Sequence, residues 1–163
     1  MRQISAFESI QNIAISALAL HSFTKGYYDF YINNPKDKQY PKLQYFFYVL
    51  PLIYHEDSLN NFYNSNNLYV VLKDYPQIST QLQNRANKMS KQTFDSLNLA
   101  FGSGLLSLNK LDSSFFVQLK RLTYINQKWP FDIDKIIKGS RKLGIMFAKS
   151  PEDNLRIKLK VIL

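Results

Sequence analysis

The sequence predicts a mainly α protein of the α+β class: a compact helical domain that carries one β-hairpin. Across most of the chain, apolar residues recur every three or four positions, which is the period of an amphipathic helix. One stretch, 105–119, instead has two short apolar runs separated by turn-forming residues. No internal repeat, low-complexity tract or composition break divides the 163 residues, so we expect a single domain over 1–163.

The first helix is predicted from an apolar stripe that includes Phe7, Ile10 and His21. Gly26 is expected to lie at its C-terminal end, because glycine is favoured just past a helix. The next segment, YYDFYINNPKDKQYP at 27–41, is rich in Asn, Asp and Pro. We therefore expect an exposed loop there, with tyrosines that can pack back on the core.

The most apolar run, KLQYFFYVLPLIYH at 42–55, is expected to form the central core helix. Exposing it would create a large apolar patch, so it must be buried. A proline inside a helix removes one backbone hydrogen bond. We therefore predict a helix over about 42–50, with a bend or restart at Pro51.

Two helices are expected next, a short one over Ser58–Tyr63 and one that Asn67 caps and Pro76 stops. The longest helical pattern then begins at Ser79 and closes at a pair of glycines. Its buried stripe is expected to comprise Leu82, Ala86, Met89, Phe94 and Leu97.

The runs Leu105–Leu108 and Phe115–Leu119 predict a β-hairpin, because NKLDSS between them has turn chemistry. Asp132 is expected to cap a further helix. Ser150-Pro151-Glu152 predicts a last helix start, and the remaining NLRIKLKVIL alternates apolar and basic residues. We take this final segment as helix first and strand second.

A short helix, a long helix and a hairpin follow one another in winged-helix domains, where the hairpin is the wing. The same order occurs here, so a winged-helix-like arrangement is one form that the domain can take. Many unrelated domains share this order, and it does not identify a function.

No signature of catalysis is present in the sequence. His21 and His55 lie on or beside apolar runs without companions at metal-ligand spacing, which is typical of structural histidines. A hydrolase that uses His55 and Asp57 is the alternative, but acids after His55 also suit a helix start. The chain has no cysteine and no phosphate-binding loop. We expect a protein that is not an enzyme and has no cofactor or metal.

The net charge of +9 permits contact with nucleic acid or with an acidic protein. On a winged helix, basic residues of the long helix, the wing tip and the segment beyond it would reach DNA phosphates. The alternative is a solvated helix face. The candidate DNA-binding residues are Arg85, Lys88, Lys91, Lys110, Lys120, Arg121 and Lys128. A second basic strip with the same two interpretations contains Arg156, Lys158 and Lys160.

Aromatic residues are frequent, with 12 Phe and 11 Tyr. They indicate either surfaces for partner proteins or the codon usage of an AT-rich genome. The N-terminal apolar segment is interrupted by polar residues and lacks a cleavage site, and the run at 42–55 is too short to span a bilayer. We expect a soluble, cytoplasmic protein without membrane contact.

Four segments together resemble the middle component of three-component ABC-type systems, which is encoded between an SMC-like ATPase and an effector in Lamassu-type bacterial defence systems. These segments are a helix running into FTKGYY, the run YFFYVLPLIYHEDSL, a long helix running into FGSGLLSL, and the closing FAKSPEDNLRIKLKVIL. Within the second segment, Leu50, Pro51, Leu52 and His55 match the structural motif of the family.

The resemblance implies a non-enzymatic subunit that links an ATPase sensor of foreign DNA to a nuclease or other effector. Its partners would be the SMC-like ATPase, the effector and, through the basic residues, double-stranded DNA. The alternative function is a freestanding winged-helix-like regulator that binds DNA by itself.

Overall fold

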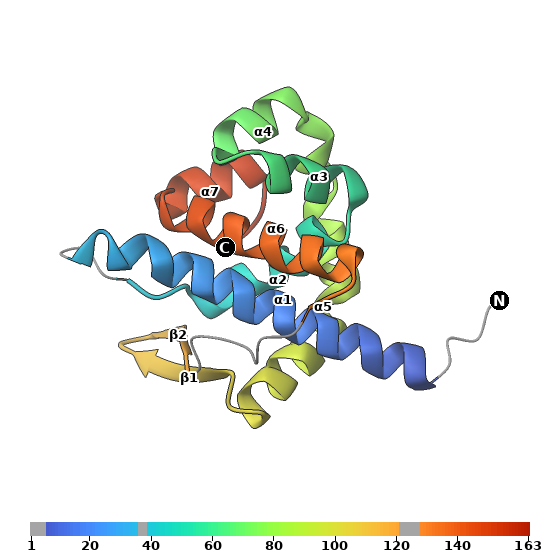
Figure 1. Cartoon of the computed structure of the whole chain (residues 1–163). Coiled ribbons are helices and arrows are strands. Elements are labelled where there is room, and N and C mark those ends of the chain that lie inside the picture. Colours follow the sequence, from blue (N-terminus) through green and yellow to red (C-terminus); the bar gives the residue numbers. More distant parts are fainter. Residues whose placement is uncertain (1–5, 36–38, 121–127) are drawn as a thin grey trace.

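The computed structural model describes residues 6–35, 39–120 and 128–163 (Figure 1). Its helices are α1 (Ala6–Ile32), α2 (Phe46–Ile53), α3 (Glu56–Asn64), α4 (Leu68–Asp74), α5 (Leu82–Gly102), α6 (Phe131–Ala148) and α7 (Glu152–Leu159). The strands β1 (Leu106–Leu111) and β2 (Ser114–Leu119) form an antiparallel hairpin. Short 3-10 turns occur at Leu43–Tyr45 and Pro76–Ile78. The predicted mainly α class with one hairpin is confirmed.

Helix α1 runs through the middle of the molecule, with α6 and α5 against it (Figure 1). Two glycines allow α1 and α6 to pack backbone to backbone. A Cβ atom on Gly26 would lie 1.9 Å from the carbonyl oxygen of Arg141, and one on Gly144 would lie 2.0 Å from that of Phe23. The prediction that Gly26 ends the helix is therefore wrong, because this glycine serves a close contact in the helix interior.

The expected loop at 27–41 is also wrong in its first part, since α1 continues to Ile32. Tyr27 and Tyr31 are buried on the core side of this extension. Their rings contact each other in a tilted arrangement, with centroids 5.6 Å apart. Burial of aromatic surface at helical spacing keeps the helix intact past the glycine.

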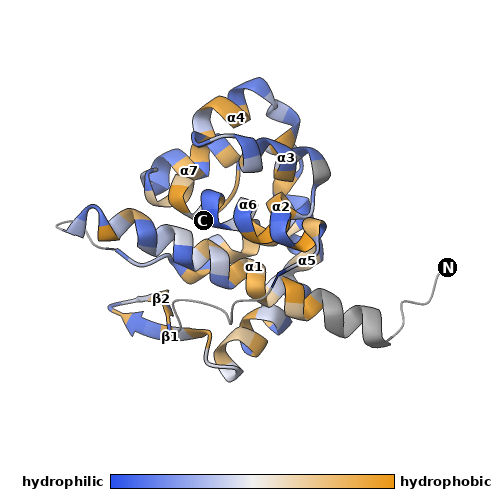
Figure 2. Cartoon of the chain, in the orientation of Figure 1, coloured by the Kyte–Doolittle hydropathy of each residue, from blue (hydrophilic) through white to orange (hydrophobic). Residues whose placement is uncertain are grey.

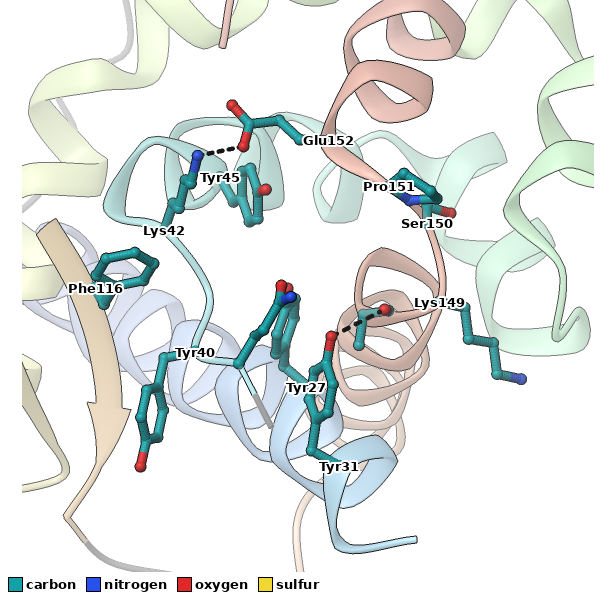
Figure 3. A pocket seen from close by; sticks show the side chains of 12 residues that line it. Tyr27, Tyr31, Tyr40, Lys42, Tyr45, Phe116, Lys149, Ser150, Pro151 and Glu152 are labelled. Carbon is teal, nitrogen blue, oxygen red and sulfur yellow. Dashed lines mark hydrogen bonds and ion pairs between the residues drawn. The ribbon is translucent and has the colours of Figure 1, made fainter. Parts of the chain in front are cut away.

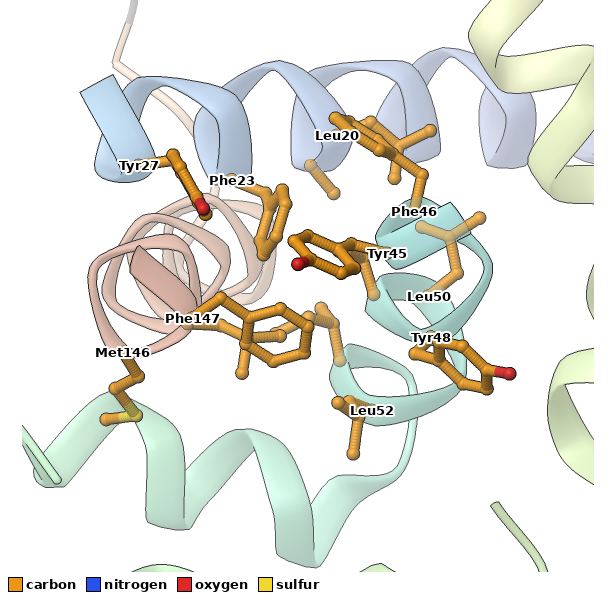
Figure 4. Packing of buried hydrophobic residues seen from close by; sticks show 14 of the residues in the cluster. Leu20, Phe23, Tyr27, Tyr45, Phe46, Tyr48, Leu50, Leu52, Met146 and Phe147 are labelled. Carbon is orange, nitrogen blue, oxygen red and sulfur yellow. The ribbon is translucent and has the colours of Figure 1, made fainter. Parts of the chain in front are cut away.

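The core forms where α1, α2 and α6 meet (Figure 4). The ring of Phe23 packs edge-on against those of Phe46 and Phe147, in each case with centroids 5.3 Å apart. Hydrophobic and hydrophilic residues alternate along the helices (Figure 2), and the buried hydrophobic residues form this core. The prediction that the run at 42–55 forms the core is confirmed.

Pro51 lies inside α2 and does not end it. A 3-10 turn at Leu43–Tyr45 leads into α2, and the amide of Tyr54 still donates to the carbonyl of Leu50, at 2.9 Å. The helix thus continues for two residues past the proline, to Ile53, where we expected a bend or restart. Loss of one backbone hydrogen bond is outweighed because every residue from Tyr48 to Ile53 is buried.

The capping prediction for α4 is confirmed, because Asn67 Oδ1 accepts from the amides of Tyr69 and Val70, at 2.9 and 3.4 Å. The predicted cap of α6 is wrong. Asp132 lies in the first turn, and Pro130 occupies the position before the helix. The carboxylate of Asp132 still stabilises α6, because a negative charge in the first turn interacts favourably with the helix dipole. The preference for helix over strand in the final segment is confirmed, because residues Glu152–Leu159 form α7.

The hairpin pairs Leu106 with Leu119 at its base and Leu111 with Ser114 at its tip. A single bridge between Lys42 and Phe116 joins the segment before α2 to the free side of β2. A short helix (α4), a long helix (α5) and the hairpin follow one another in the expected order. That these elements act as a winged helix stays a prediction. Among the described helices, none combines the length and the apolar character needed to cross a membrane.

Candidate functional site

The predicted DNA-binding residues do not all have free cationic groups. Arg85 is half-buried and donates from Nη1 to the carbonyl of Thr80 at 3.0 Å and from Nη2 to that of Ile78 at 2.6 Å. Burial lowers the pKa of this guanidinium. Arg85 therefore closes the turn that precedes α5. Lys91 forms an ion pair with Asp95, at 2.6 Å, on the exposed face of the same helix.

Four of the predicted lysines are exposed and form no ion pair within the described part of the chain: Lys88, Lys110, Lys120 and Lys128. Arg121 lies outside the described residues. Lys110 is close to the hairpin tip and Lys120 follows its base, roughly 15 Å away at the usual rise of a strand. Lys88 lies about 20 Å along α5 from the end that leads into the hairpin. These lysines are dispersed over α5, the hairpin and the segment before α6.

His55 has a structural role in this geometry. It occupies the position before α3, and its Nδ1 atom lies 3.1 Å from the hydroxyl of the buried Ser58. Asp57 is exposed, and its backbone carbonyl accepts from the amide of Asn61. His21 is fully buried in α1. In the described part of the chain, no group of three or more His, Asp or Glu side chains is placed to hold a metal ion.

A polar pocket of about 290 Å³, which the sequence did not reveal, lies where α1, residues 39–45, β2 and the start of α7 meet (Figure 3). Tyr27 and Tyr31 line one side, and Tyr45 faces them from the other (Figure 3). Lys42 and Glu152 form an ion pair at its rim, about one third exposed. These residues are far apart in sequence, so only the fold brings them together.

Burial raises the pKa of both Tyr27 and Tyr45 far above the ordinary value of 10.0. For Tyr45, the negative charge of Glu152 and a hydrogen bond to it raise the pKa further. For Tyr27, the neighbouring Tyr31 has the same effect. Both phenols are neutral donors at any physiological pH. Because Glu152 accepts from Lys42, Gln44 and Tyr45, its carboxylate joins the start of α7 to the segment that leads into α2.

A basic groove of about 520 Å³ between the end of α3 and α6 was also missed. Its cations are Lys138, Arg141 and Lys142, and Tyr63 lines the opposite side. Lys138 pairs with Asp134 at 2.6 Å, and Lys142 donates to the carbonyl of Tyr63 at 2.6 Å. Arg141 binds Asp29 of α1 through Nε and Nη2, at 2.7 Å each. These contacts hold α1 and α3 against α6.

An aromatic surface, defined here as Phe47, Phe94, Leu108 and Phe115, connects α2, α5 and the hairpin. Phe94 was predicted to be buried, and this is wrong: 52% of it is exposed. Its ring packs edge-on against Phe47, with centroids 4.9 Å apart. Phe47 and Phe115 line a common groove of about 250 Å³. The helical pattern alone could not separate Phe94 from the core stripe, because the position lies at the edge of that stripe.

A protein-family model described as Middle Component 3 of ABC-three component (ABC-3C) systems matches residues 2–161. No curated protein and no solved structure is significantly similar to the chain. The match includes the buried run at 42–55, every described strand and the helices that build the pocket, the groove and the aromatic surface. The chain therefore belongs to the Middle Component 3 family of ABC-three component systems.

Proposed function

We propose that the chain is a non-enzymatic, cytoplasmic subunit of a Lamassu-type defence complex. In this complex it bridges an SMC-like ATPase, which senses foreign DNA, and a nuclease-type or other effector. The observation that carries the proposal is membership of a middle-component family over nearly the whole chain. A component of a multi-component system has partner subunits, and a bridge needs at least two separate contact surfaces.

The surface chemistry supports a binding role. The cations that line the pocket and the groove are engaged with groups of neighbouring elements, as expected for side chains that hold a scaffold together. Large apolar side chains remain exposed on separate elements, among them Phe94 on α5 and Tyr69 on α4. Aromatic residues are enriched at protein interfaces, where they supply much of the binding energy.

DNA contact is a second part of the proposal and is assigned to the four unpaired lysines Lys88, Lys110, Lys120 and Lys128. Phosphate contacts of dispersed lysines give affinity that depends on salt and not on sequence. Arg85 is left out of this set because its guanidinium is bound to backbone carbonyls.

The test is co-expression of this chain with the ATPase and effector encoded by the neighbouring genes. We expect a ternary complex in size-exclusion chromatography, and no stable ATPase–effector pair when this chain is left out. Omission of the effector gene alone is the control, since the ATPase should then still retain this chain. Separate elution of all three proteins would overturn the proposal.

The alternative, a freestanding DNA-binding regulator, is supported by one structural observation. The bridge between Lys42 and Phe116 adds a third segment to the hairpin, between the first and second helices, as in a winged-helix sheet. A regulator must bind duplex DNA without partners, so absence of duplex binding by the isolated protein at low salt would exclude this alternative. Duplex binding by the isolated chain together with separate elution from the ATPase and the effector would favour the regulator.

A further inference from the structure

The aromatic surface continues the hydrophobic core out to solvent along the hairpin. Leu106 and Val117 at the hairpin base are almost fully buried. Leu108 and Phe115 lie on the same face, because alternate residues of a strand share a face and the register pairs Leu108 with Val117. Yet Leu108 is 43% exposed and Phe115 is 45% exposed. The hairpin therefore projects its apolar face beyond the core that covers its base.

Phe94 and Phe47 extend this apolar face from the hairpin onto the helices. The Phe47 ring contacts Phe94 on one side and faces the groove shared with Phe115 on the other. Contiguous apolar patches of this kind mark binding sites in soluble proteins. The groove, at about 250 Å³, is smaller than the roughly 300–1,000 Å³ of small-molecule sites. It suits one or two side chains of another protein.

The charges around the aromatic surface indicate what kind of partner fits. Among the described residues that line the groove, only Lys42 is charged, and Glu152 neutralises it. Lys91 is neutralised by Asp95. Lys110 lies over the Phe115 ring at 5.9 Å and has no carboxylate partner in the described part of the chain. The rim is thus mostly neutral, with one free positive charge beside the exposed ring.

We propose that the aromatic surface binds a partner subunit of the same system through an apolar segment that carries a carboxylate. A bulky apolar side chain enters the groove between Phe47 and Phe115, and the carboxylate pairs with Lys110. This inference rests on the proposed function, since it names the surface by which the bridging subunit holds one of its partners.

Two other occupants fit the surface less well. A nucleic acid strand needs several unpaired cations along its phosphates, and the groove rim offers Lys110 alone. A second copy of this chain would bring two Lys110 residues and two net charges of +9 together. A segment of another protein that carries apolar side chains and a carboxylate fits both the apolar groove and the positive charge of Lys110.

The test uses whichever of the two partners, the ATPase or the effector, retains this chain in the co-expression experiment. The affinity of that partner is measured for the unmodified chain and for purified variants of the chain. Phe94→Asp and Phe115→Asp place a carboxylate in the apolar contact, and each is expected to weaken binding by about 30-fold or more, as at interface hot spots. Lys110→Gln should weaken it by only about 5-fold. The control is Leu99→Asp, because Leu99 is 43% exposed on the same helix but points about 140° away from Phe94, and its affinity should stay within about 3-fold.

Each variant is checked by thermal unfolding, and hydrogen exchange of the unmodified chain gives an independent readout. In the complex, amides of 106–119 should exchange more slowly than in the isolated protein. Equal affinity of folded Phe94→Asp, Phe115→Asp and Leu99→Asp, in a complex that does form, would overturn this inference and leave the proposed function standing. Failure of the unmodified chain to form any complex would overturn the proposed function itself. A homodimer that Phe94→Asp dissolves would assign the surface to a second copy and overturn the partner stated here.

Discussion

At the scale of single residues, the contact between α1 and α6 depends on the absence of two Cβ atoms. The nearest atoms to the added methyl groups of Gly26→Ala and Gly144→Ala would be backbone carbonyls, which cannot move by changing a rotamer. We expect each substitution to lower the free energy of unfolding by about 2 kcal/mol or more, which exceeds the gain of about 1 kcal/mol from alanine's helix propensity. Chemical denaturation measures the change.

The matched control is Gly102→Ala at the end of α5, where an added Cβ atom meets nothing within 4 Å. Its stability should stay the same or rise by up to about 1 kcal/mol. Equal effects of all three substitutions would show that the helices are not in close contact at Gly26 and Gly144.

The buried phenols of Tyr27 and Tyr45 give the protein a pH limit. Their pKa values are raised in the folded state above the ordinary 10.0, so the stability they contribute is fully present below about pH 10. Above that pH the unfolded chain loses protons that the folded chain keeps, and the free energy of unfolding falls as pH rises. Two such groups give a slope of about 2.7 kcal/mol per pH unit.

Denaturant unfolding between about pH 9 and about pH 11 tests this, with the double variant Tyr27→Phe/Tyr45→Phe for comparison. Lysines titrate in both proteins, so the difference between the two slopes isolates the phenols. The double variant should be less stable at pH 7, because Tyr45 loses its hydrogen bond to Glu152, and should show a shallower decline at high pH. An identical slope in both proteins would contradict the assignment.

At the scale of elements, Arg85 and Lys88 lie on the same helix but have opposite roles. Arg85→Ala leaves the carbonyls of Ile78 and Thr80 without their guanidinium donor, and we expect a loss of about 1–2 kcal/mol in unfolding free energy. Lys88→Ala, the control at an exposed site, should change stability by less than about 0.5 kcal/mol. Arg85→Lys should not restore the loss, because an ammonium cannot bind both carbonyls as the planar fork does. Denaturation profiles that rank Lys88→Ala as the more harmful would contradict this division.

The sequence predicted elements where the local pattern and the packing agree. Asn67 caps α4, and the hairpin turns at Asp112 and Ser113, inside the predicted turn NKLDSS, because both features depend on neighbours in sequence. The strands extend further into that segment than predicted, since β1 runs to Leu111 and β2 begins at Ser114. The prediction failed at Gly26 and Phe94. The helix passes Gly26 because α6 packs against it at that point, and Phe94 is half exposed because its ring packs against Phe47 of α2 at the edge of the core. These outcomes depend on contacts between distant segments, which a helical period does not encode.

For the candidate sites too, the sequence predicted the local features and missed those that depend on contacts between distant segments. The basic character of the chain was evident from its composition, and exposed lysines at 88, 110, 120 and 128 agree with it. Composition does not show which cationic side chains already have partners within the protein. Arg85 donates to backbone carbonyls, and Lys42 forms an ion pair with Glu152. Neither the polar pocket nor the aromatic surface has a sequence signal, because each combines residues from three or more elements.

At the scale of the whole molecule, the two kinds of binding that a bridge needs depend on different surfaces. The aromatic surface is apolar with a nearly neutral rim, whereas the unpaired lysines extend along α5, the hairpin and the segment before α6. Apolar contact is little affected by salt, while phosphate contacts weaken steeply as salt rises. Partner binding and DNA binding should therefore be separable by substitution and by ionic strength. Lys110 is the exception, because it takes part in both.

The separating experiment uses the complex with duplex DNA. In the triple variant Lys88→Gln, Lys120→Gln and Lys128→Gln, we expect the complex to assemble normally, because none of these lysines belongs to the aromatic surface. The slope of log affinity against log salt for duplex DNA should become shallower by about 0.9 for each lysine that contacts a phosphate. Phe94→Asp should give the opposite result, with loss of the partner and an unchanged DNA slope for the isolated chain. Loss of partner binding in the lysine variant would show that one surface serves both ligands, which contradicts a bridge with separate contacts.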